Sequence, residues 1–200
     1  MRRHLVLFVR APALGRGKRR LAHEIGDVAA LRFERLMIAR LLRRLGNDAR
    51  WHLRIAMTPD QTCRRARISQ PAYTVVGQGR GDLGVRMARA IAAAPPGPVV
   101  LIGGDVPAIE AGHIAAAFRL LGSCDLVFGP ARDGGFWLVG ARRRPRSPAP
   151  LFAGVRWSSP YALADTLGGL PQHLRVGFVE TLEDVDDRAG YRRLNPLRGF

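Results

Sequence analysis

The chain has 200 residues, of which 47% are hydrophobic and 24% are charged. This length and balance are typical of one globular domain, so we expect a single domain over residues 1–200 and exclude a disordered or fibrous chain. No run approaches the roughly 18 apolar residues that a membrane-spanning helix needs, and no signal-peptide pattern is present. The two cysteines lie outside any zinc or disulfide motif. These features predict a cytoplasmic protein without a membrane partner.

The charge is strongly positive, with 32 basic against 16 acidic residues and a formal net charge of +16. Such a charge is compatible with a basic nucleic-acid-binding module. However, the arginines are spread along the whole chain, aromatic residues make up only 7%, and no nucleic-acid-binding motif is present. We therefore expect a solvated, arginine-rich surface and no specific nucleic-acid partner.

Strands and helices alternate along the sequence. In chain order we expect a strand at residues 5–9, a helix at 29–42, a strand at 53–57, a short helix after residue 60, a strand at 73–76, a helix at 82–94, a strand at 98–102, a helix at 108–121, strands at 125–129 and 136–140, a helix that starts at Ser158 or Ser159 and ends at 167, a strand at 174–179 and a closing helix within 184–194. We expect a surface loop at residues 142–150.

The strands at residues 5–9 and 98–102 are continuous apolar runs, which is typical of strands buried on both faces of a parallel sheet. Alternating strands and helices then predict an α/β fold in which helices cover both faces of a mostly parallel sheet. In such folds ligands bind beyond the carboxyl ends of the strands. The segments that follow the apolar strands are therefore the candidate functional segments.

The first of these segments, residues 10–20, combines glycines with several cations. Backbone N–H groups and cations in a glycine-rich loop suit a polyphosphate, although the spacing matches neither a Walker loop nor a dinucleotide fingerprint. The alternative is an ordinary exposed basic turn. Lys18 is the one lysine of the chain, and a lysine retained among so many arginines indicates a compact charge placed on a phosphate oxygen.

Three other segments carry carboxylates. Asp105 follows the strand at residues 98–102 and is either a metal ligand or the N-cap of the next helix. The acidic residues 183–187 supply oxygen ligands of the kind that Mg²⁺ or Mn²⁺ prefers, or they form the start of a helix. Asp133 lies in a turn with two glycines and is either an acceptor-orienting base or a turn residue that binds local backbone.

Taken together, these segments resemble a known bacterial family. The similar motifs are LFVRAPALGRGKRRL, QGRGDLGVRM, LIGGDVP, GPARDGGFWLVG, LFAGVRWSS and DVDD, at residues 7–21, 78–87, 101–107, 129–140, 151–159 and 184–187. The family is a glycosyltransferase-A-like group known as a domain of unknown function or selenodomain-associated transferase 1, and it is sometimes linked to arsenosugar biosynthesis. The resemblance implies one domain with the nucleotide-diphospho-sugar transferase fold.

The resemblance also implies roles for individual residues. Lys18, Asp105 and Asp133 are the expected catalytic residues, and Asp105 and Asp186 the expected ligands of a Mg²⁺ or Mn²⁺ ion. The expected nucleotide-binding residues are Ala11, Pro12, Gly15, Lys18, Arg20, Asp82 and Gly84. The expected acceptor-binding residues are Asp133, Gly134, Gly135 and Trp157. Asp82 has the alternative role of capping its helix, and Trp157 that of a half-buried core aromatic residue.

Two enzyme functions remain open at this point. The first is a metal-dependent glycosyltransferase that moves a sugar from a nucleotide-sugar to a small acceptor. The second is a nucleotidyltransferase that couples a nucleoside triphosphate to a phosphorylated metabolite. Residues 103–105 contain one aspartate, whereas many glycosyltransferases carry two in a DxD motif, which keeps the second function open. The fold alone does not separate them, because function depends on the site.

Overall fold

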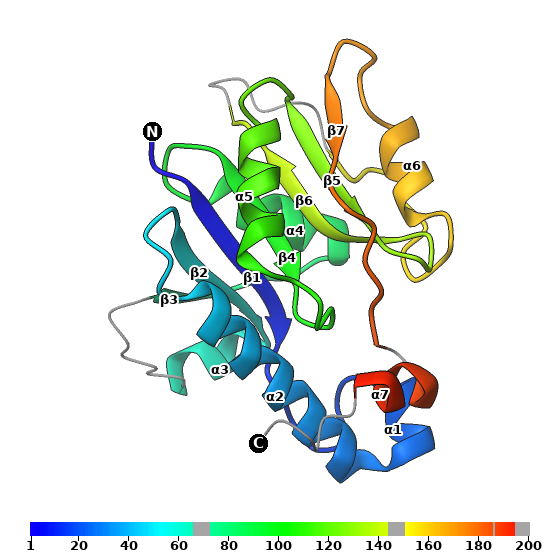
Figure 1. The fold of residues 1–200 in the computed structure, drawn as a ribbon. Coiled ribbons are helices and arrows are strands. Elements are labelled where there is room, and N and C mark those ends of the chain that lie inside the picture. Colours follow the sequence, from blue (N-terminus) through cyan, green and yellow to red (C-terminus); the bar gives the residue numbers. More distant parts are fainter. Residues whose placement is uncertain (66–72, 144–150, 186, 195–200) are drawn as a thin grey trace.

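A computed structural model describes residues 1–65, 73–143, 151–185 and 187–194. Most of the predicted surface loop at residues 142–150 and the predicted metal ligand Asp186 lie outside these residues. Figure 1 shows a central sheet with helices on both sides. Within the described residues, no helix is long and apolar enough to cross a membrane.

The described residues contain one seven-stranded sheet with the order β3-β2-β1-β4-β6-β5-β7. The strands are β1 His4–Arg10, β2 His52–Thr58, β3 Tyr73–Gly77, β4 Val99–Gly103, β5 Leu126–Pro130, β6 Phe136–Ala141 and β7 Val176–Phe178. β6 is antiparallel to β4 and β5, and the other pairs are parallel. The predicted α/β class with a mostly parallel sheet is confirmed.

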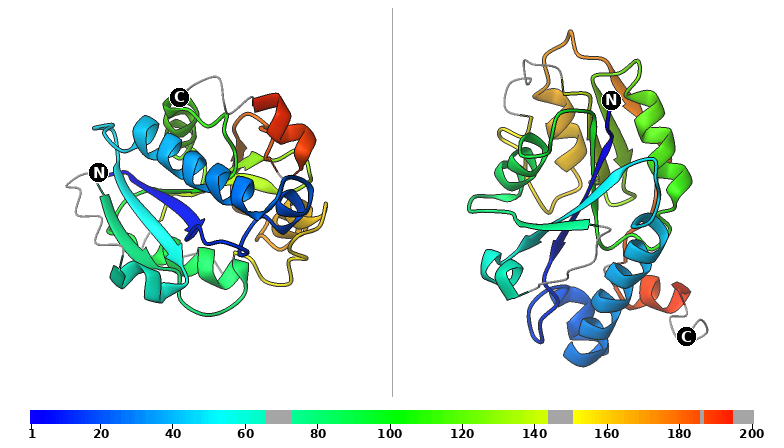
Figure 2. Two further views of the ribbon diagram at one scale, coloured as in Figure 1. Left: turned by 90° about the horizontal axis from the view of Figure 1, so that it is seen from below. Right: turned by 90° about the vertical axis from the view of Figure 1, so that its left-hand side faces the viewer.

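Helices cover both faces of this sheet (Figure 2). They are α1 Arg19–Ile25, α2 Asp27–Leu45, α3 Asp60–Arg65, α4 Leu83–Ala92, α5 Ala111–Leu120, α6 Ala162–Gly168 and α7 Arg188–Leu194. Alternate residues of β1 show the two faces, because successive side chains of a strand point in opposite directions. Leu5 and Leu7 pack in one core with residues of α2 and α5, whereas Val6 packs in a second core with residues of α4 and α6.

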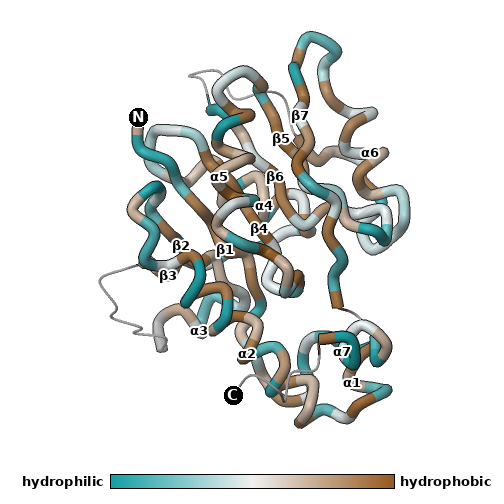
Figure 3. Tube along the Cα trace, viewed as in Figure 1, coloured by the Kyte–Doolittle hydropathy of each residue, from teal (hydrophilic) through white to brown (hydrophobic). Residues whose placement is uncertain are grey.

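A third, smaller cluster lies away from the sheet. Leu21 of α1, Phe33 and Met37 of α2, and Val185 form its buried part, and Tyr191 of α7 packs against them. Figures 1 and 2 show α1 and α7 side by side, next to the start of α2. In Figure 3 hydrophobic stretches lie on the central strands, and hydrophobic and hydrophilic residues alternate along the helices. α2 therefore joins the sheet core to the α1–α7 cluster.

The sheet topology brings the candidate segments to one edge. β1, β4, β5 and β7 run in the same direction, so their carboxyl ends share that edge, and the turn from β5 to β6 lies there too. The loop after β1, the segment after β4, the β5–β6 turn and the segment after β7 therefore meet where ligands of α/β proteins bind.

Two local predictions were wrong. No helix was expected before residue 29, but residues 19–25 form α1, which buries only Leu21 and Ala22. α6 starts at Ala162 and not at the predicted Ser158-Ser159-Pro160 cap. The Ser159 hydroxyl instead donates to the Arg156 carbonyl at 2.6 Å and accepts from the Tyr161 N–H at 3.2 Å, so it stabilises a turn before the helix.

Candidate active site

Lys18 connects three segments that are far apart in the sequence. Its ammonium nitrogen donates to the Val185 carbonyl at 2.6 Å and lies 3.7 Å from a carboxylate oxygen of Asp105. The Val185 N–H in turn donates to the Asp105 carbonyl at 3.2 Å. The β1 loop, the exit of β4 and the acidic segment after β7 are thus held together at the sheet edge, as the sequence predicted.

The backbone of Lys18 has an unusual conformation. Lys18 has a φ of +22° and precedes α1, and its side chain is only 11% exposed. Positive φ values are uncommon for residues other than glycine and occur preferentially at functional sites. The surrounding structure therefore fixes the direction of this ammonium group, which is what a positioned phosphate-binding charge requires.

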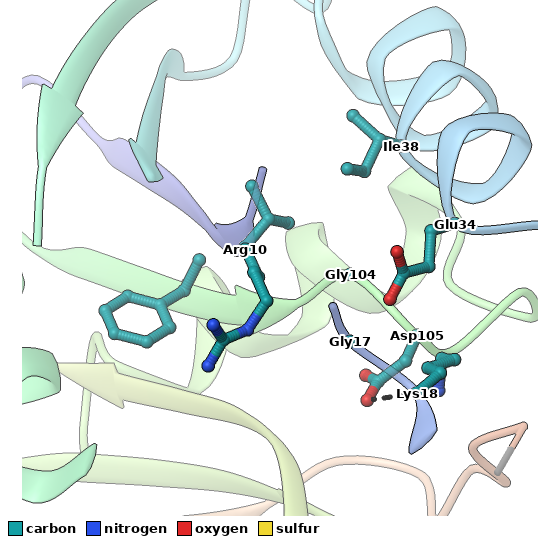
Figure 4. Close-up of a pocket in the computed structure, with 9 residues that line it drawn as sticks. Arg10, Gly17, Lys18, Glu34, Ile38, Gly104 and Asp105 are labelled. Carbon is teal, nitrogen blue, oxygen red and sulfur yellow. Dashed lines mark ion pairs between the residues drawn. The ribbon is translucent and has the colours of Figure 1, made fainter. Parts of the chain in front are cut away.

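A cavity of about 210 Å³ lies beside Lys18. Its lining consists of Phe8, Val9, Arg10, Gly17, Lys18, Glu34, Ile38, Gly104 and Asp105. Figure 4 shows Glu34 and Ile38 projecting from α2 toward the backbone at Gly104, with Lys18 and Asp105 paired beside Gly17. The cavity thus combines two cations with two carboxylates, and we refer to it as the donor cavity.

Glu34 is a site residue that the sequence did not reveal. A Cβ atom at Gly17 would overlap with Oε1 of Glu34, so the phosphate-loop candidate and α2 approach each other closely here. Burial raises the pKa of Glu34, although the positive charges of Lys18 and Arg10 act in the opposite direction. In the sequence this glutamate is indistinguishable from the solvated charges of an arginine-rich helix.

A second cavity, of about 500 Å³, shares Asp105 with the donor cavity. We call it the acceptor cavity. Apolar and aromatic residues form much of its lining, namely Leu83, Met87, Val106, Ala131, Phe136, Trp137, Trp157, Pro160 and Ala162. The other lining residues are Arg20, Asp105, Asp133, Gly135, Ser158, Ser159 and Asp184. A large, mostly apolar pocket with a few polar groups is typical of a small-molecule site.

Asp133 lies on the β5–β6 turn. Its Oδ1 atom accepts a hydrogen bond from the Gly135 N–H at 2.9 Å, which is the predicted turn interaction. Gly134 has a φ of +88°, and a Cβ atom there would overlap with the Pro160 carbonyl, so this position requires glycine. The turn thus holds an exposed carboxylate in the lining of the acceptor cavity, with Oδ1 fixed by this hydrogen bond.

Trp157 is half-buried and belongs to an aromatic cluster. Its ring centroid lies 6.2 Å from that of Phe136 and 5.9 Å from that of Phe152. Gly84 of α4 packs against the same group, since a Cβ atom there would lie 2.8 Å from Cζ2 of Trp157. Trp157 is therefore a packed core aromatic that also lines the acceptor cavity. Gly84, a predicted nucleotide-binding residue, makes room for the aromatic cluster.

An ion pair orients the segment that carries Trp157. Asp165 of α6 accepts from the Arg156 backbone N–H at 3.0 Å and from the Arg156 guanidinium at 2.7 and 2.8 Å. These hydrogen bonds lower the pKa of Asp165 to about 2. Ser158, directly after Trp157, has a φ of +57° and also lines the acceptor cavity.

The segment at residues 78–82 is held in place by hydrogen bonds to β1, β2 and α4. The Asp82 carboxylate accepts from the Val85 N–H at 2.8 Å and caps α4, so the capping alternative is observed. The buried Gln78 amide donates to the carbonyls of Val9 and Ala56. Arg86 donates to the amide oxygen of Gln78 at 2.8 Å. This network joins the ends of β1 and β2 to α4.

The remaining predicted residues take different places. Arg20 lines the acceptor cavity. Ala11, Pro12 and Gly15 lie in the loop from β1 to α1, and among the described residues they contribute to neither lining. Asp105 does not cap α5, which begins six residues later after Glu110.

The carboxylates around Asp105 fit a divalent ion that binds together with a substrate. Asp105 is 45% exposed, and Asp184 lines the same acceptor cavity. Among the described residues, no group of three or more His, Cys, Asp or Glu side chains forms a ready metal cage. Mg²⁺ commonly binds through one or two carboxylates plus substrate phosphates, so this donor set suits an ion completed by a diphosphate.

Three solved structures define the class of this fold. A protein of Desulfovibrio desulfuricans G20 with the provisional name nucleotide-diphospho-sugar transferase is 28% identical, with a TM-score of 0.84 over 94% of this chain and 84% of that chain. A nucleotidyl transferase from Methanothermobacter thermautotrophicus is 16% identical, with a TM-score of 0.62 over 95% of each chain. Rv0371c from Mycobacterium tuberculosis, in complex with manganese, is 17% identical, with a TM-score of 0.53 over 97% of this chain and 98% of that chain.

The fold is therefore that of the nucleotide-diphospho-sugar transferases, as the sequence predicted, and two of these three neighbours are named as transferases. The family model described as uncharacterized protein conserved in bacteria (DUF2064) matches residues 41–159, more than half of the sequence. The chain belongs to this family. A comparison with curated proteins gave no match.

Proposed function

We propose that the chain is a metal-dependent transferase that uses a nucleotide-activated donor, with transfer of a sugar to a small acceptor as its main candidate reaction. One observation carries this proposal: two adjoining cavities share Asp105, and Lys18 lines one of them while aromatic side chains line the other. Two adjoining cavities with different linings suit a reaction between a phosphate-bearing donor and a less polar acceptor.

Lys18 and Arg20 carry out the donor-side chemistry in this proposal. Lys18 is held between Asp105 and the Val185 carbonyl, so it can neutralise a diphosphate oxygen with little reorganisation. Arg20 follows on the first turn of α1 and lines the acceptor cavity, where it can contact the same phosphates. As the sugar–phosphate bond breaks, both cations stabilise the negative charge that develops on the leaving nucleoside diphosphate.

Asp105 would hold Mg²⁺ or Mn²⁺ together with Asp184 or with the predicted ligand Asp186. The ion supplies further charge neutralisation on the donor phosphates when it is bound. The manganese complex of the fold neighbour Rv0371c supports this choice of metal. The position of Asp105, shared by both cavities, suits a group that acts at the junction of donor and acceptor.

Asp133 and Trp157 carry out the acceptor-side chemistry. Asp133 would orient the acceptor hydroxyl and take its proton as the new bond to the sugar carbon forms. Oδ1 of Asp133 is fixed by the Gly135 N–H, which sets the direction of Oδ2. Trp157 offers an aromatic surface for the acceptor body. The proton and the nucleoside diphosphate then leave as the remaining products.

Nucleotidyl transfer is the second candidate. A single aspartate at residues 103–105, in place of a DxD pair, favours it, and so does the nucleotidyl transferase among the fold neighbours. In that reaction a phosphorylated metabolite attacks the α-phosphorus of a nucleoside triphosphate, and pyrophosphate leaves. The product therefore separates the two reactions, because glycosyl transfer releases a nucleoside diphosphate.

A thermal-shift panel tests the proposal. Purified protein is mixed with nucleoside triphosphates and nucleotide-sugars, each with and without Mn²⁺. A ligand that binds only the native state raises the Tm, so at least one nucleotide should give a Mn²⁺-dependent rise. Asp105→Asn should lose this rise, whereas Glu180→Gln, a change at an exposed carboxylate outside both linings, should keep it. No Mn²⁺-dependent rise with any nucleotide would contradict both transferase reactions.

A further inference from the structure

We propose that the acceptor cavity takes an uncharged or cationic hydroxyl compound with an apolar body and rejects a phosphorylated one. This inference rests on the proposed function, because it names the class of acceptor for the transferase. It follows from the charges of the lining residues, the shape of the aromatic surface and the free oxygen of Asp133. Each of these three features belongs to the described residues.

The charges of the acceptor cavity oppose an anionic ligand. Asp105, Asp133 and Asp184 line it, and Arg20 is the one cation among its described lining residues. Because Asp105 also pairs with Lys18 of the donor cavity, Asp133 is the carboxylate that an anionic acceptor would meet. Two like charges in contact near a protein surface repel each other, because the effective dielectric constant there is well below that of water. A phosphate dianion next to Asp133 would meet this repulsion, and like-charge contacts of this kind are a common means of rejecting a wrong ligand.

The positive charge of Arg20 does not make the cavity suitable for a phosphorylated acceptor. It lies two residues after Lys18, at the start of α1. In the proposed function it is occupied by the donor diphosphate. A divalent ion on Asp105 would likewise be taken up by the donor, whereas Asp133 belongs to a different segment, the β5–β6 turn.

The remaining lining favours an apolar body. Phe136 and Trp157 present aromatic surface, and Leu83 and Met87 of α4 add aliphatic surface next to it. A volume of about 500 Å³ falls within the usual range of small-molecule pockets. Aromatic rings of this kind stack on apolar rings or on the C–H face of a sugar, and they also attract cations.

Asp133 supplies the contact that a hydroxyl group needs. Its Oδ1 atom is used by the Gly135 N–H, and within the described residues Oδ2 has no hydrogen bond of its own. A carboxylate oxygen can accept a hydrogen bond from a hydroxyl or an ammonium group but not from a phosphate dianion. The geometry therefore selects a hydrogen-bond donor at this end of the cavity.

This acceptor class also bears on the reaction. The nucleotidyl alternative requires a phosphorylated acceptor in the same cavity, whereas glycosyl transfer needs only a hydroxyl group. A cavity that rejects phosphate therefore favours glycosyl transfer. The two proposals remain separable, because nucleotide binding tests the donor cavity and acceptor selectivity tests the acceptor cavity.

The experiment compares three ligands with the same body. Protein saturated with Mn²⁺ and with the nucleotide that stabilises it most is titrated with 2-(4-hydroxyphenyl)ethanol, its amine analogue and its phosphate ester, and dissociation constants are measured by NMR. We expect the alcohol and the amine to bind at least about tenfold more tightly than the phosphate. A tenfold difference in the dissociation constant corresponds to about 1.4 kcal/mol, which one unfavourable charge contact can supply. In Asp133→Asn this difference should shrink severalfold.

Two controls make the outcome decisive. Glu180→Gln removes the same charge outside the cavity lining and should leave the selectivity unchanged. Asp133→Asn should keep the nucleotide-induced rise in Tm, which shows that the variant is folded and that the donor cavity is intact. Equal or tighter binding of the phosphate, or no binding of the alcohol and the amine, would overturn the inference while leaving nucleotide binding, and with it the proposed function, intact.

Discussion

The donor and acceptor cavities share Asp105 but are built by different means. The donor cavity depends on charges fixed by backbone contacts, since Lys18 is held by the Val185 carbonyl and by Asp105. The acceptor cavity depends on packing, since Trp157 is held by Phe136, Phe152 and α4. Substitutions in the first should therefore affect ligand binding with little loss of stability, whereas substitutions in the second should affect both.

The largest expected effect follows from removing the donor-cavity charges. Lys18→Ala or Asp105→Asn should reduce transfer by at least about 100-fold, because positioned charges of this kind contribute two to three orders of magnitude to catalysis. Turnover is measured by release of the nucleoside diphosphate. Arg16→Ala removes an exposed loop cation that lies outside both cavities and serves as the control. Turnover within threefold of the native protein for both Lys18→Ala and Asp105→Asn would refute the donor site.

The next largest effect is expected in the acceptor cavity, which depends on packing. Trp157→Ala should raise the acceptor KM about tenfold, as expected for the loss of about 1.4 kcal/mol of binding. It should also lower the free energy of unfolding by about 2 kcal/mol, less than the loss for a fully buried tryptophan because Trp157 is half-buried. Trp157→Phe should restore stability and part of the affinity. An unchanged acceptor KM in Trp157→Ala would exclude this residue from acceptor binding.

A pair of glycine substitutions tests the close approach of the phosphate loop to α2. Both Gly15 and Gly17 have positive φ values, so alanine is strained at either position. A Cβ atom at Gly17 would also overlap with Glu34, whereas a Cβ atom at Gly15 would have no neighbouring atom within 4 Å. Gly17→Ala should therefore weaken nucleotide binding severalfold more than Gly15→Ala in a calorimetric titration. Equal effects would mean that Glu34 does not influence the donor cavity.

The smallest effect concerns the ion pair behind Trp157. The pKa of Asp165 is lowered to about 2, so its contribution to stability is present above the ordinary aspartate pKa of about 3.9 and is lost as the pH falls toward 2. Asp165→Asn should therefore lower the Tm slightly at pH 7, and the difference from the native protein should become much smaller as the pH falls toward 2. A difference in Tm that does not change between pH 7 and pH 2 would contradict this origin.

The positions of several site residues could be predicted from the sequence, because the end of an apolar run shows where a buried parallel strand ends. The apolar runs that became β1 and β4 indicated where Lys18 and Asp105 would lie, and the topology then brought them within 3.7 Å. The two-glycine turn likewise identified Asp133. The positions of these residues followed from local patterns and a general rule for α/β sheets, whereas their expected roles came from the family resemblance.

Other features depended on tertiary contacts. α1 was missed because it has only two buried residues, so its hydrophobic pattern is weak. Glu34 was missed because only the fold brings it to Gly17. Ser158 and Ser159 carry a helix-start signal, but Ser159 forms hydrogen bonds within a turn and α6 begins later. In each case packing decided between local alternatives.

Isothermal titration of the nucleotide that stabilises the protein most, in the presence of Mn²⁺, tests the division between the two cavities most directly. The native protein, Lys18→Ala and Trp157→Phe are compared. We predict that Lys18→Ala loses nucleotide affinity by at least about tenfold, whereas Trp157→Phe binds the nucleotide as tightly as the native protein. Loss of nucleotide affinity in Trp157→Phe with native affinity in Lys18→Ala would contradict the placement of the donor beside Lys18.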